Sequence, residues 1–173
     1  PGFAFLLTTI AAYGEDGWED YWQQLADGGL TVTSGWNDAY YGEFIAGGGD
    51  KSIVTSYASS PVAEVLFADP PVETPPTSVL LDACWRQIEF AGVLAGAEHP
   101  EAGAQLIDFM LSETFQSDIP LNMFVSPVNA DVELPEVFTA NLAVPSRALT
   151  IPPEEIEANR AEWTERWAEI VLR

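Results

Sequence analysis

The chain has 173 residues, 47% hydrophobic and 12% aromatic, a composition that excludes a disordered protein and provides for one sizeable core. Its 27 Asp and Glu residues against 6 Lys and Arg give a net charge of −21, which excludes nucleic acid as a partner and opposes docking on anionic lipid. This charge favours the approach of a cationic ligand, and it equally fits a strongly solvated surface.

Cysteine content and hydropathy narrow the class further. The single cysteine, Cys84, excludes an internal disulfide and a cysteine-based metal site. Beside Trp85 it is expected to be a small buried hydrophobe with an inert thiol. No apolar run reaches the roughly 18 residues that span a bilayer, and no signal peptide is visible. Because the chain begins abruptly and without Met, we expect it to be an internal fragment.

Helix and strand patterns alternate along the chain. Apolar periodicity and helix-start and helix-stop residues predict helices over 3–12, 18–26, 36–46, 61–67, 100–111, 135–142 and 153–172. Short apolar runs predict strands over 30–32, 53–57, 79–81 and 85–92, and an extended segment over 125–128. Ser112 is expected to cap a further helical turn, and the proline-rich segment 69–77 is expected to be a surface loop. This alternation predicts an α/β fold.

Small polar and aromatic residues gather where apolar runs end. Trp36 follows the run at 31–33, and Tyr57 ends the run at 53–57. Ser59 and Ser60 stand before a proline at a predicted helix start, where hydroxyls can hydrogen-bond a ligand. Ligands of open α/β sheets lie outside the carboxyl ends of the strands. These residues therefore predict a cleft for a small, partly aromatic solute rather than a catalytic centre.

Two other chemistries stay open at this point. Tyr40 and Tyr41 are adjacent, and tyrosinate oxygens can bind ferric iron, although packing explains at least one of the two rings. Cys84 and His99 could form a nucleophile pair if they met in space. His99 alone fits an exposed residue at the entry of a helix. No glycine-rich phosphate loop or zinc-binding spacing occurs.

Several motifs in order carry a family resemblance. They are Gly35-Trp36-Asn37-Asp38-Ala39-Tyr40, Ser56-Tyr57, Ser60-Pro61, Gln87-Ile88-Glu89, Phe109-Met110-Leu111-Ser112, Phe115-Gln116, Ile119-Pro120, Pro127-Val128 and Asn159-Arg160-Ala161-Glu162-Trp163. With them the whole chain resembles thiamine-binding periplasmic proteins of bacterial ABC importers. The resemblance implies the two-lobed, type II periplasmic-binding-protein-like fold, of which this chain would be about the second half. Residues 1–92 would lie mainly in the second ligand-binding lobe, and residues 93–173 would return to the first.

The resemblance also implies a function and partners. Such a receptor is no enzyme and has no cofactor or metal; it carries thiamine or thiamine phosphate to the transmembrane subunits of an ABC permease. It would lie in the periplasm or outside the cell, with a lipid anchor as one option through the missing N-terminal half. That half would also be a partner of this chain. Rival functions are a receptor for ferric iron or another small solute, and a thiamine-cleaving enzyme of the same fold.

The resemblance assigns roles to individual residues. Trp36 and Tyr57 occupy ligand-contact positions, and Phe124 stands where relatives place a ring over the pyrimidine. Ala63 departs from the pattern, because thiamine-binding relatives often carry a stacking tyrosine there. Loss of one stacked ring weakens binding about tenfold.

The resemblance further implies that part of the helical surface is covered by the first lobe. Leu106, Phe109, Trp163 and Trp167 would lose much of their packing partner when that lobe's sheet is absent. We therefore expect the chain by itself to dimerise or to associate with its missing half.

Overall fold

The computed structural model describes residues 1–145 and 148–173, and the chain forms two compact units. Unit 1 comprises Pro1–Tyr57, Leu80–Gln87 and Val144–Arg173, and unit 2 comprises Ala58–Val79 and Ile88–Ala143. Each unit is therefore built from segments that are distant in sequence. The expected division at residues 92 and 93 concerns the lobes of a larger protein and stays a prediction.

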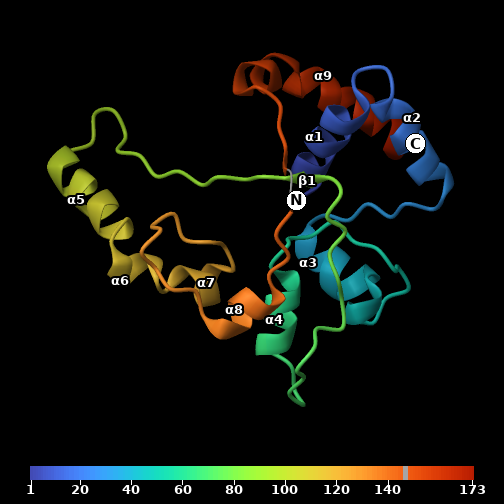
Figure 1. The fold of residues 1–173 in the computed structure, drawn as a ribbon. Helices are drawn as coiled ribbons and strands as arrows, with labels where there is room; N and C mark the ends of the chain where they lie inside the picture. The colour runs from blue at the N-terminus through green and yellow to red at the C-terminus, as the bar shows by residue number, and fades with distance from the viewer. Residues whose placement is uncertain (146–147) are drawn as a thin grey trace. The chain divides into compact units, whose positions relative to one another are not determined.

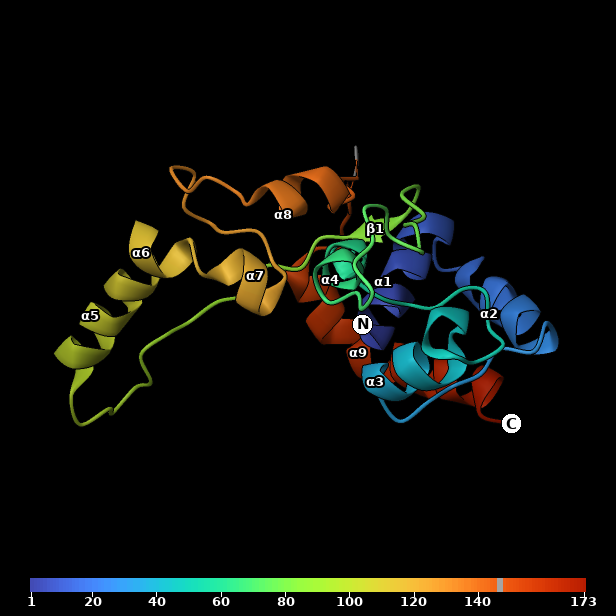
Figure 2. The same cartoon turned by 90° about the horizontal axis from the view of Figure 1, so that it is seen from below.

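Three long helices form the frame of unit 1 (Figures 1 and 2). They are α1 (Gly2–Tyr13), α2 (Trp18–Asp27) and α9 (Pro153–Val171). The glycine pair after Asp27 ends α2, and Pro153 at the first helical position starts α9. α2 packs against both α9 and α1. The predicted helices at 3–12, 18–26 and 153–172 are confirmed to within one residue at each end.

Large apolar side chains from all three helices form the core of unit 1. The buried set is Leu6, Leu7, Ile10, Trp18, Trp22, Ile151 and Trp163. Trp163 is only 1% exposed and Trp167 packs partly buried against this core. The expectation that these two rings lose much of their packing partner is therefore wrong, because residues of α1 and α2 of the same chain pack around them.

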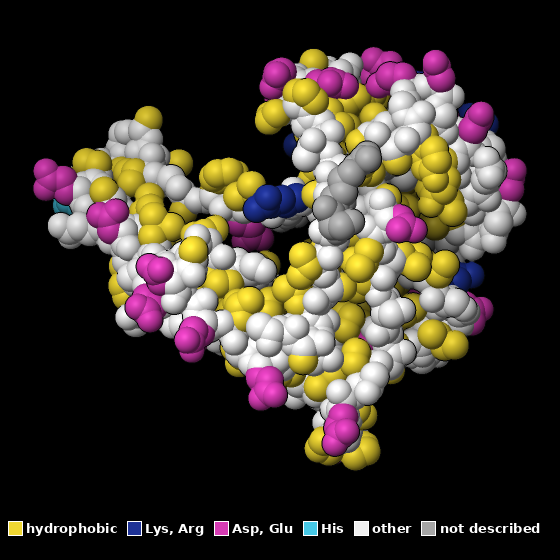
Figure 3. Space-filling model, viewed as in Figure 1, with side chains coloured by type: hydrophobic (Ala, Val, Ile, Leu, Met, Phe, Trp, Pro, Cys, Tyr) yellow, Lys and Arg dark blue, Asp and Glu magenta, His cyan; other side chains and the backbone are white. Residues whose placement is uncertain are grey.

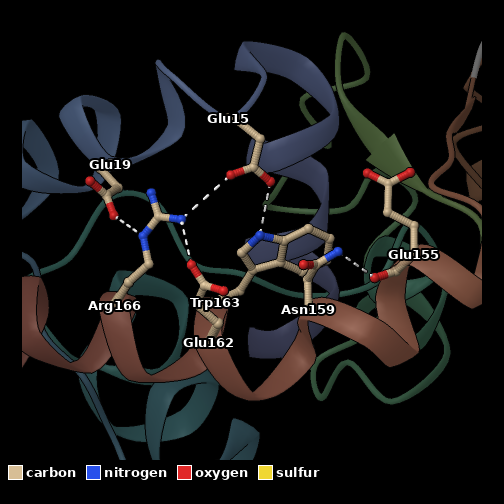
Figure 4. Close-up of polar contacts among 7 residues, drawn as sticks. All are labelled: Glu15, Glu19, Glu155, Asn159, Glu162, Trp163 and Arg166. Atoms are coloured by element: carbon tan, nitrogen blue, oxygen red, sulfur yellow. Dashed lines mark hydrogen bonds and ion pairs between the residues drawn. The ribbon is translucent and has the colours of Figure 1, made fainter.

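An acidic cluster around one arginine joins α9 to the beginning of α2 (Figure 4). The Arg166 guanidinium forms ion pairs with Glu15, Glu19 and Glu162 and lies 5.1 Å from the centroid of the Trp18 ring. The hydrogen bond to Glu19 raises the pKa of Arg166, so this cation persists at every ordinary pH. Glu15 also accepts a 3.0 Å hydrogen bond from the Trp163 indole nitrogen. This cluster is a structural tie at the edge of the core.

The sheet is much smaller than the sequence predicts. Strands β1 (Cys84–Trp85) and β2 (Ala148–Leu149) pair in parallel, Cys84 with Ala148 and Trp85 with Leu149. The predicted strands at 30–32, 53–57 and 79–81 are wrong, and that at 85–92 survives only at Trp85. A strand needs a hydrogen-bonded neighbour, and these segments have none among the residues that the structure describes. The observed content is helical with a small sheet.

Unit 2 consists of short helices joined by long connections. They are α4 (Ser60–Leu66), α5 (Pro100–Met110), α6 (Glu113–Gln116), α7 (Ile119–Met123) and α8 (Glu136–Asn141). α4 packs against α8, where Val62 and Phe138 are fully buried. The predicted helices at 61–67, 100–111 and 135–142 are confirmed, as is the cap at Ser112, whose hydroxyl accepts from the Phe115 amide. α7 was missed because it has only five residues, too few for apolar periodicity to show.

A buried glutamine connects the loops of unit 2. The Gln116 amide nitrogen donates to the Met110 carbonyl at 2.7 Å, and its oxygen accepts from the amides of Val128 and Asn129 at 2.7 and 3.4 Å. These bonds hold the chain after α7 against the end of α5. The segment after Phe124 is thereby placed by a side chain that has its polar atoms satisfied.

Unit 2 exposes large apolar side chains on α5 and in the connection before it. Phe90 is 88% exposed in the extended connection before α5, and Leu94, Leu106 and Phe109 are also exposed. The expectation of uncovered side chains on α5 is therefore met, in contrast to α9. In unit 1, acidic side chains gather along the outer edge over α9 (Figure 3). Within residues 1–145 and 148–173, no helix combines the length and apolar character needed to cross a bilayer.

Candidate ligand-binding site

A cluster of aromatic rings centres on Trp36 in unit 1. The Tyr40 ring stacks on the Trp36 indole with centroids 4.9 Å apart and planes 25° apart. Tyr41 meets the indole edge-on at 5.5 Å, and Tyr57 meets it at 5.9 Å with a 55° tilt. Phe44 adds a tilted contact with Tyr40 at 5.4 Å. The structure thus brings together Trp36 and Tyr57, two of the residues that the sequence predicts to bind ligand.

The backbone of this cluster is an irregular helix. The predicted helix at 36–46 is divided into α3 (Trp36–Asp38), a π-helical turn (Ala39–Glu43) and a 3₁₀ turn (Ile45–Gly47). The Phe44 amide donates to the Ala39 carbonyl at 2.9 Å, an i to i−5 bond that widens the turn. Gly48 ends the segment in the left-handed conformation with φ 98°. Single π-helical turns of this kind are frequent at functional sites.

A hydrogen bond fixes the orientation of Trp36. Its indole nitrogen donates to the Ser56 hydroxyl at 2.9 Å, a residue 20 positions later and directly before Tyr57. This bond brings Trp36 close to the segment that carries Tyr57, although that segment is an irregular connection rather than a strand. Tyr57 itself is 48% exposed, so it is partly accessible to a solute.

Ser59 and Ser60 lie at the start of α4 in unit 2, as the sequence predicts. Ser59 is buried and precedes the first helical residue; its carbonyl accepts from the amides of Val62 and Ala63 at 3.1 and 3.3 Å. The Ser59 side chain does not cap the helix. Ser60 is half-buried, so of the two hydroxyl-bearing residues it is the more accessible.

Phe124 ends α7 in the left-handed region with φ 54° and ψ 33°. This conformation is rare for a bulky residue and persists only where the surrounding structure holds it. Its half-buried ring contacts the Phe67 ring at 5.7 Å with planes 60° apart. Phe67 directly follows α4 and comes four residues after Ala63. Ala63 and Phe67 therefore lie about one helical turn apart. Phe67 is 70% exposed.

Sequence reasoning missed two ring contacts at these positions. It treated Tyr40 as packing or as an iron ligand and did not see that it stacks on Trp36. It did not consider Phe67 at all. The spacing between Ala63 and Phe67 could have indicated a second ring on the same face of a helix. The i, i+4 spacing of Trp36 and Tyr40 likewise places both rings on one helix face, whereas the contact of Trp36 with Tyr57 joins segments distant in sequence and is decided by the tertiary structure.

Unit 2 also contains an open groove of about 550 Å³ beside α4 and α8. Polar side chains of the proline-rich loop and α8 line it, among them Thr74, Thr77, Ser78 and Asn141. Thr77 donates to the Glu64 carboxylate at 2.5 Å. None of the five predicted ligand residues lines this groove, so it is separate from the aromatic positions.

The two rival chemistries are ferric-iron binding by Tyr40 and Tyr41 and a nucleophilic role for Cys84. Tyr40 is 6% exposed and Tyr41 63% exposed, so their hydroxyls lie in different environments. Burial, together with Asp82, raises the pKa of the Cys84 thiol, and the thiol lies 3.6 Å from the Leu80 carbonyl oxygen. A raised pKa makes the thiolate scarcer at neutral pH and opposes a nucleophilic role. Among the described residues no group of three or more His, Cys, Asp and Glu is arranged to hold a metal.

Comparison with known proteins identifies the class. The sequence matches the family of bacterial extracellular solute-binding proteins over residues 2–149. The chain therefore belongs to this family. No solved structure matches the chain significantly.

The relatives that the chain resembles carry a more specific description than the family, since each is a thiamine-binding periplasmic protein. The thiamine-binding periplasmic protein of Escherichia coli (strain K12) is 34% identical over 173 residues, which are 100% of this chain and 50% of that protein. The thiamine-binding periplasmic protein of Salmonella typhimurium (strain LT2) is 33% identical with the same coverage. That of Brucella suis biovar 1 is 32% identical over 169 residues, 96% of this chain and 48% of that protein. The chain spans about half the length of these relatives.

Proposed function

We propose that this chain is part of an extracytoplasmic receptor that binds thiamine or thiamine phosphate and delivers it to an ABC import permease. The observation that carries the proposal is the Trp36 cluster, in which Tyr57 and a hydrogen-bonded indole form an accessible aromatic surface in unit 1. It occurs in a chain whose relatives are thiamine-binding periplasmic proteins. The periplasm, or the outer face of the cell, is the corresponding location.

The chemistry of thiamine suits these side chains. Its thiazolium ring is a cation, and a cation over an aromatic face gains roughly 0.5–2 kcal/mol. Its pyrimidine is flat, and stacking of a flat ring on an aromatic side chain such as Phe124 adds about 0.5–1.5 kcal/mol beyond area burial. The net charge of −21 also favours the approach of a cation.

The polar end of the ligand needs hydrogen-bond donors. Thiamine ends in a hydroxyl group, and thiamine phosphate in an anion. The half-buried Ser60 and the buried Ser59 at the start of α4 are the hydrogen-bonding set that the sequence predicts. We assign it this role in the proposed function, beside the ring of Phe124 in the same unit.

The environment of Cys84 favours a protein that binds thiamine over an enzyme that cleaves it. A thiamine-cleaving enzyme on this chain would need Cys84 as its nucleophile. Burial raises the pKa of that thiol, which lowers the thiolate fraction at neutral pH. The proposed receptor needs no such group and no cofactor.

Calorimetric titration of the protein with thiamine and thiamine phosphate tests the proposal. The titration uses the 173-residue chain and also the protein encoded by the complete reading frame, because the relatives are about twice as long as this chain. We expect saturable heat with at least one of the two ligands in the complete protein. Ferric ion is the control, and a tyrosinate-to-iron charge-transfer band would favour that rival. Clear binding of another solute, with no heat from either thiamine form, would overturn the proposal.

A further inference from the structure

Tyr41 is an exposed ring that the proposed function leaves unused. We propose that Tyr41, Trp36 and Tyr57 form an aromatic cage for the cationic ring of the ligand, and that Tyr40 is a positioning residue for the cage. In the receptor proposed above, the cationic ring is the thiazolium of thiamine. The inference rests on that proposed function, and it names the part of the ligand that unit 1 binds.

The first step is the support of Trp36. Tyr40 is 6% exposed and stacks almost parallel on the indole at 4.9 Å. The bond from the indole nitrogen to Ser56 ties the ring at its edge. One face of Trp36 is thus covered by a buried ring, and its rotation is blocked by a hydrogen bond. The indole is held in position before any ligand binds, which lowers the entropy lost on binding.

The second step is the arrangement of the two exposed rings. Tyr41 lies 80° from the plane of Trp36 and Tyr57 lies 55° from it, at centroid distances of 5.5 and 5.9 Å. Both rings remain accessible, Tyr41 more than Tyr57. Tilted and edge-to-face pairs at these distances are favourable between neutral rings as well, and non-parallel rings can in addition each turn a π-face to one positive charge. The arrangement can therefore accept a cation.

The third step is the local charge. Asp38 and Glu43 are exposed on the same irregular helix that carries Tyr41, and residues 36–43 contain no basic residue. Asp38 accepts a hydrogen bond from the Ser34 hydroxyl, which holds the carboxylate at the start of this segment. The two carboxylates add a negative potential around the rings and thereby increase the preference for a cationic ligand over a neutral one.

The test is calorimetry with thiamine on the complete protein and three variants. Tyr41→Ala is expected to weaken binding about three- to thirtyfold, and Tyr41→Phe to retain most of the affinity because it keeps the ring. Tyr13→Ala is the matched control: Tyr13 is also exposed in unit 1 and stacks on Tyr21 at 4.8 Å, away from Trp36 in sequence. The Tyr13→Ala variant should bind thiamine with the affinity of the wild type.

A second probe separates failure of the cage from failure of the proposed function. The N-methylated thiazolium fragment of thiamine and the neutral thiazole are each titrated while NMR signals of the Trp36 and Tyr41 rings are followed. We expect the cation to shift both signals and the neutral fragment to shift neither. If thiamine itself does not bind but the cation shifts the signals, the proposed function fails and the cage stands. Wild-type thiamine affinity in Tyr41→Ala, or equal shifts from both fragments, would overturn the cage.

Discussion

The aromatic positions of the two units differ in how firmly they are held. In unit 1, the indole of Trp36 contacts three tyrosine rings and is tied by a hydrogen bond to Ser56. In unit 2, the Phe124 ring contacts Phe67 alone among the ring pairs of the described residues. A ring that is supported from several sides is preorganised, whereas a ring that contacts one exposed ring is less constrained before a ligand binds.

Backbone geometry sharpens this difference. The rings of unit 1 are placed by a continuous, if irregular, helical segment. Phe124 is instead placed by a left-handed residue at the end of α7, a conformation that costs of order 1–3 kcal/mol. Gln116 holds the loop that follows it. Unit 2 therefore positions its ring through loop contacts and local strain, and unit 1 through ring packing.

The hydrophobic cores of the two units also differ, in the size of the side chains that they bury. Unit 1 buries Trp18, Trp22 and Trp163 between long helices, whereas the buried apolar side chains of unit 2 are chiefly Val62 and Phe138 between two short ones. Larger side chains bury more apolar area and contribute more to stability. We therefore expect the largest mutational effects on stability in unit 1.

Trp163→Ala tests that expectation with the largest effect. It should lower the free energy of unfolding by about 3–5 kcal/mol, because it leaves a cavity in the core and removes the hydrogen bond to Glu15. Phe138→Ala in unit 2 should cost less. Urea unfolding followed by circular dichroism measures both, with the exposed Leu172→Ala as a control of near-zero effect. A greater loss from Phe138→Ala than from Trp163→Ala would reverse the comparison.

Trp36→Phe tests whether the supported indole matters for binding. The substitution keeps an aromatic ring but removes the nitrogen that donates to Ser56, so thiamine binding should weaken about tenfold, or about 1.4 kcal/mol. Ser56→Ala should act in the same direction, and the double variant should lose less than the sum of the two. Calorimetry supplies the affinities. Additive losses would show that the hydrogen bond does not couple the two residues to the ligand.

Ala63→Tyr has the smallest expected effect and concerns unit 2. A ring at this half-buried position lies one helical turn from Phe67 and adds to the Phe67–Phe124 pair. Thiamine binding should become tighter by about 0.5–1.5 kcal/mol. Ala63→Leu is the control, since it adds bulk without a π-system. Unchanged or weaker binding in a folded Ala63→Tyr protein would mean that this pair does not face the ligand.

The sequence by itself determined the helices with clear boundaries. α1, α2, α5 and α9 carry apolar side chains at helical spacing and begin or end at proline or glycine, so local forces alone set their limits. The start of α4 at Ser59 and Ser60 was found for the same reason. The family was visible as well, because motifs such as that at 35–40 keep their order along the chain.

Only the tertiary structure decided which segments pair and which rings meet. The apolar runs at 53–57 and 85–92 have strand-like composition, but a strand exists only when a neighbour supplies hydrogen bonds. Among the described residues, strand pairing joins β1 with β2, and one isolated bridge joins Phe44 with Lys51. Trp163 is buried because α1 and α2, about 150 residues earlier, pack on α9. Tyr40 and Tyr41 are adjacent in sequence, yet one supports Trp36 and the other is exposed. Such outcomes depend on contacts between distant residues, which local propensity does not contain.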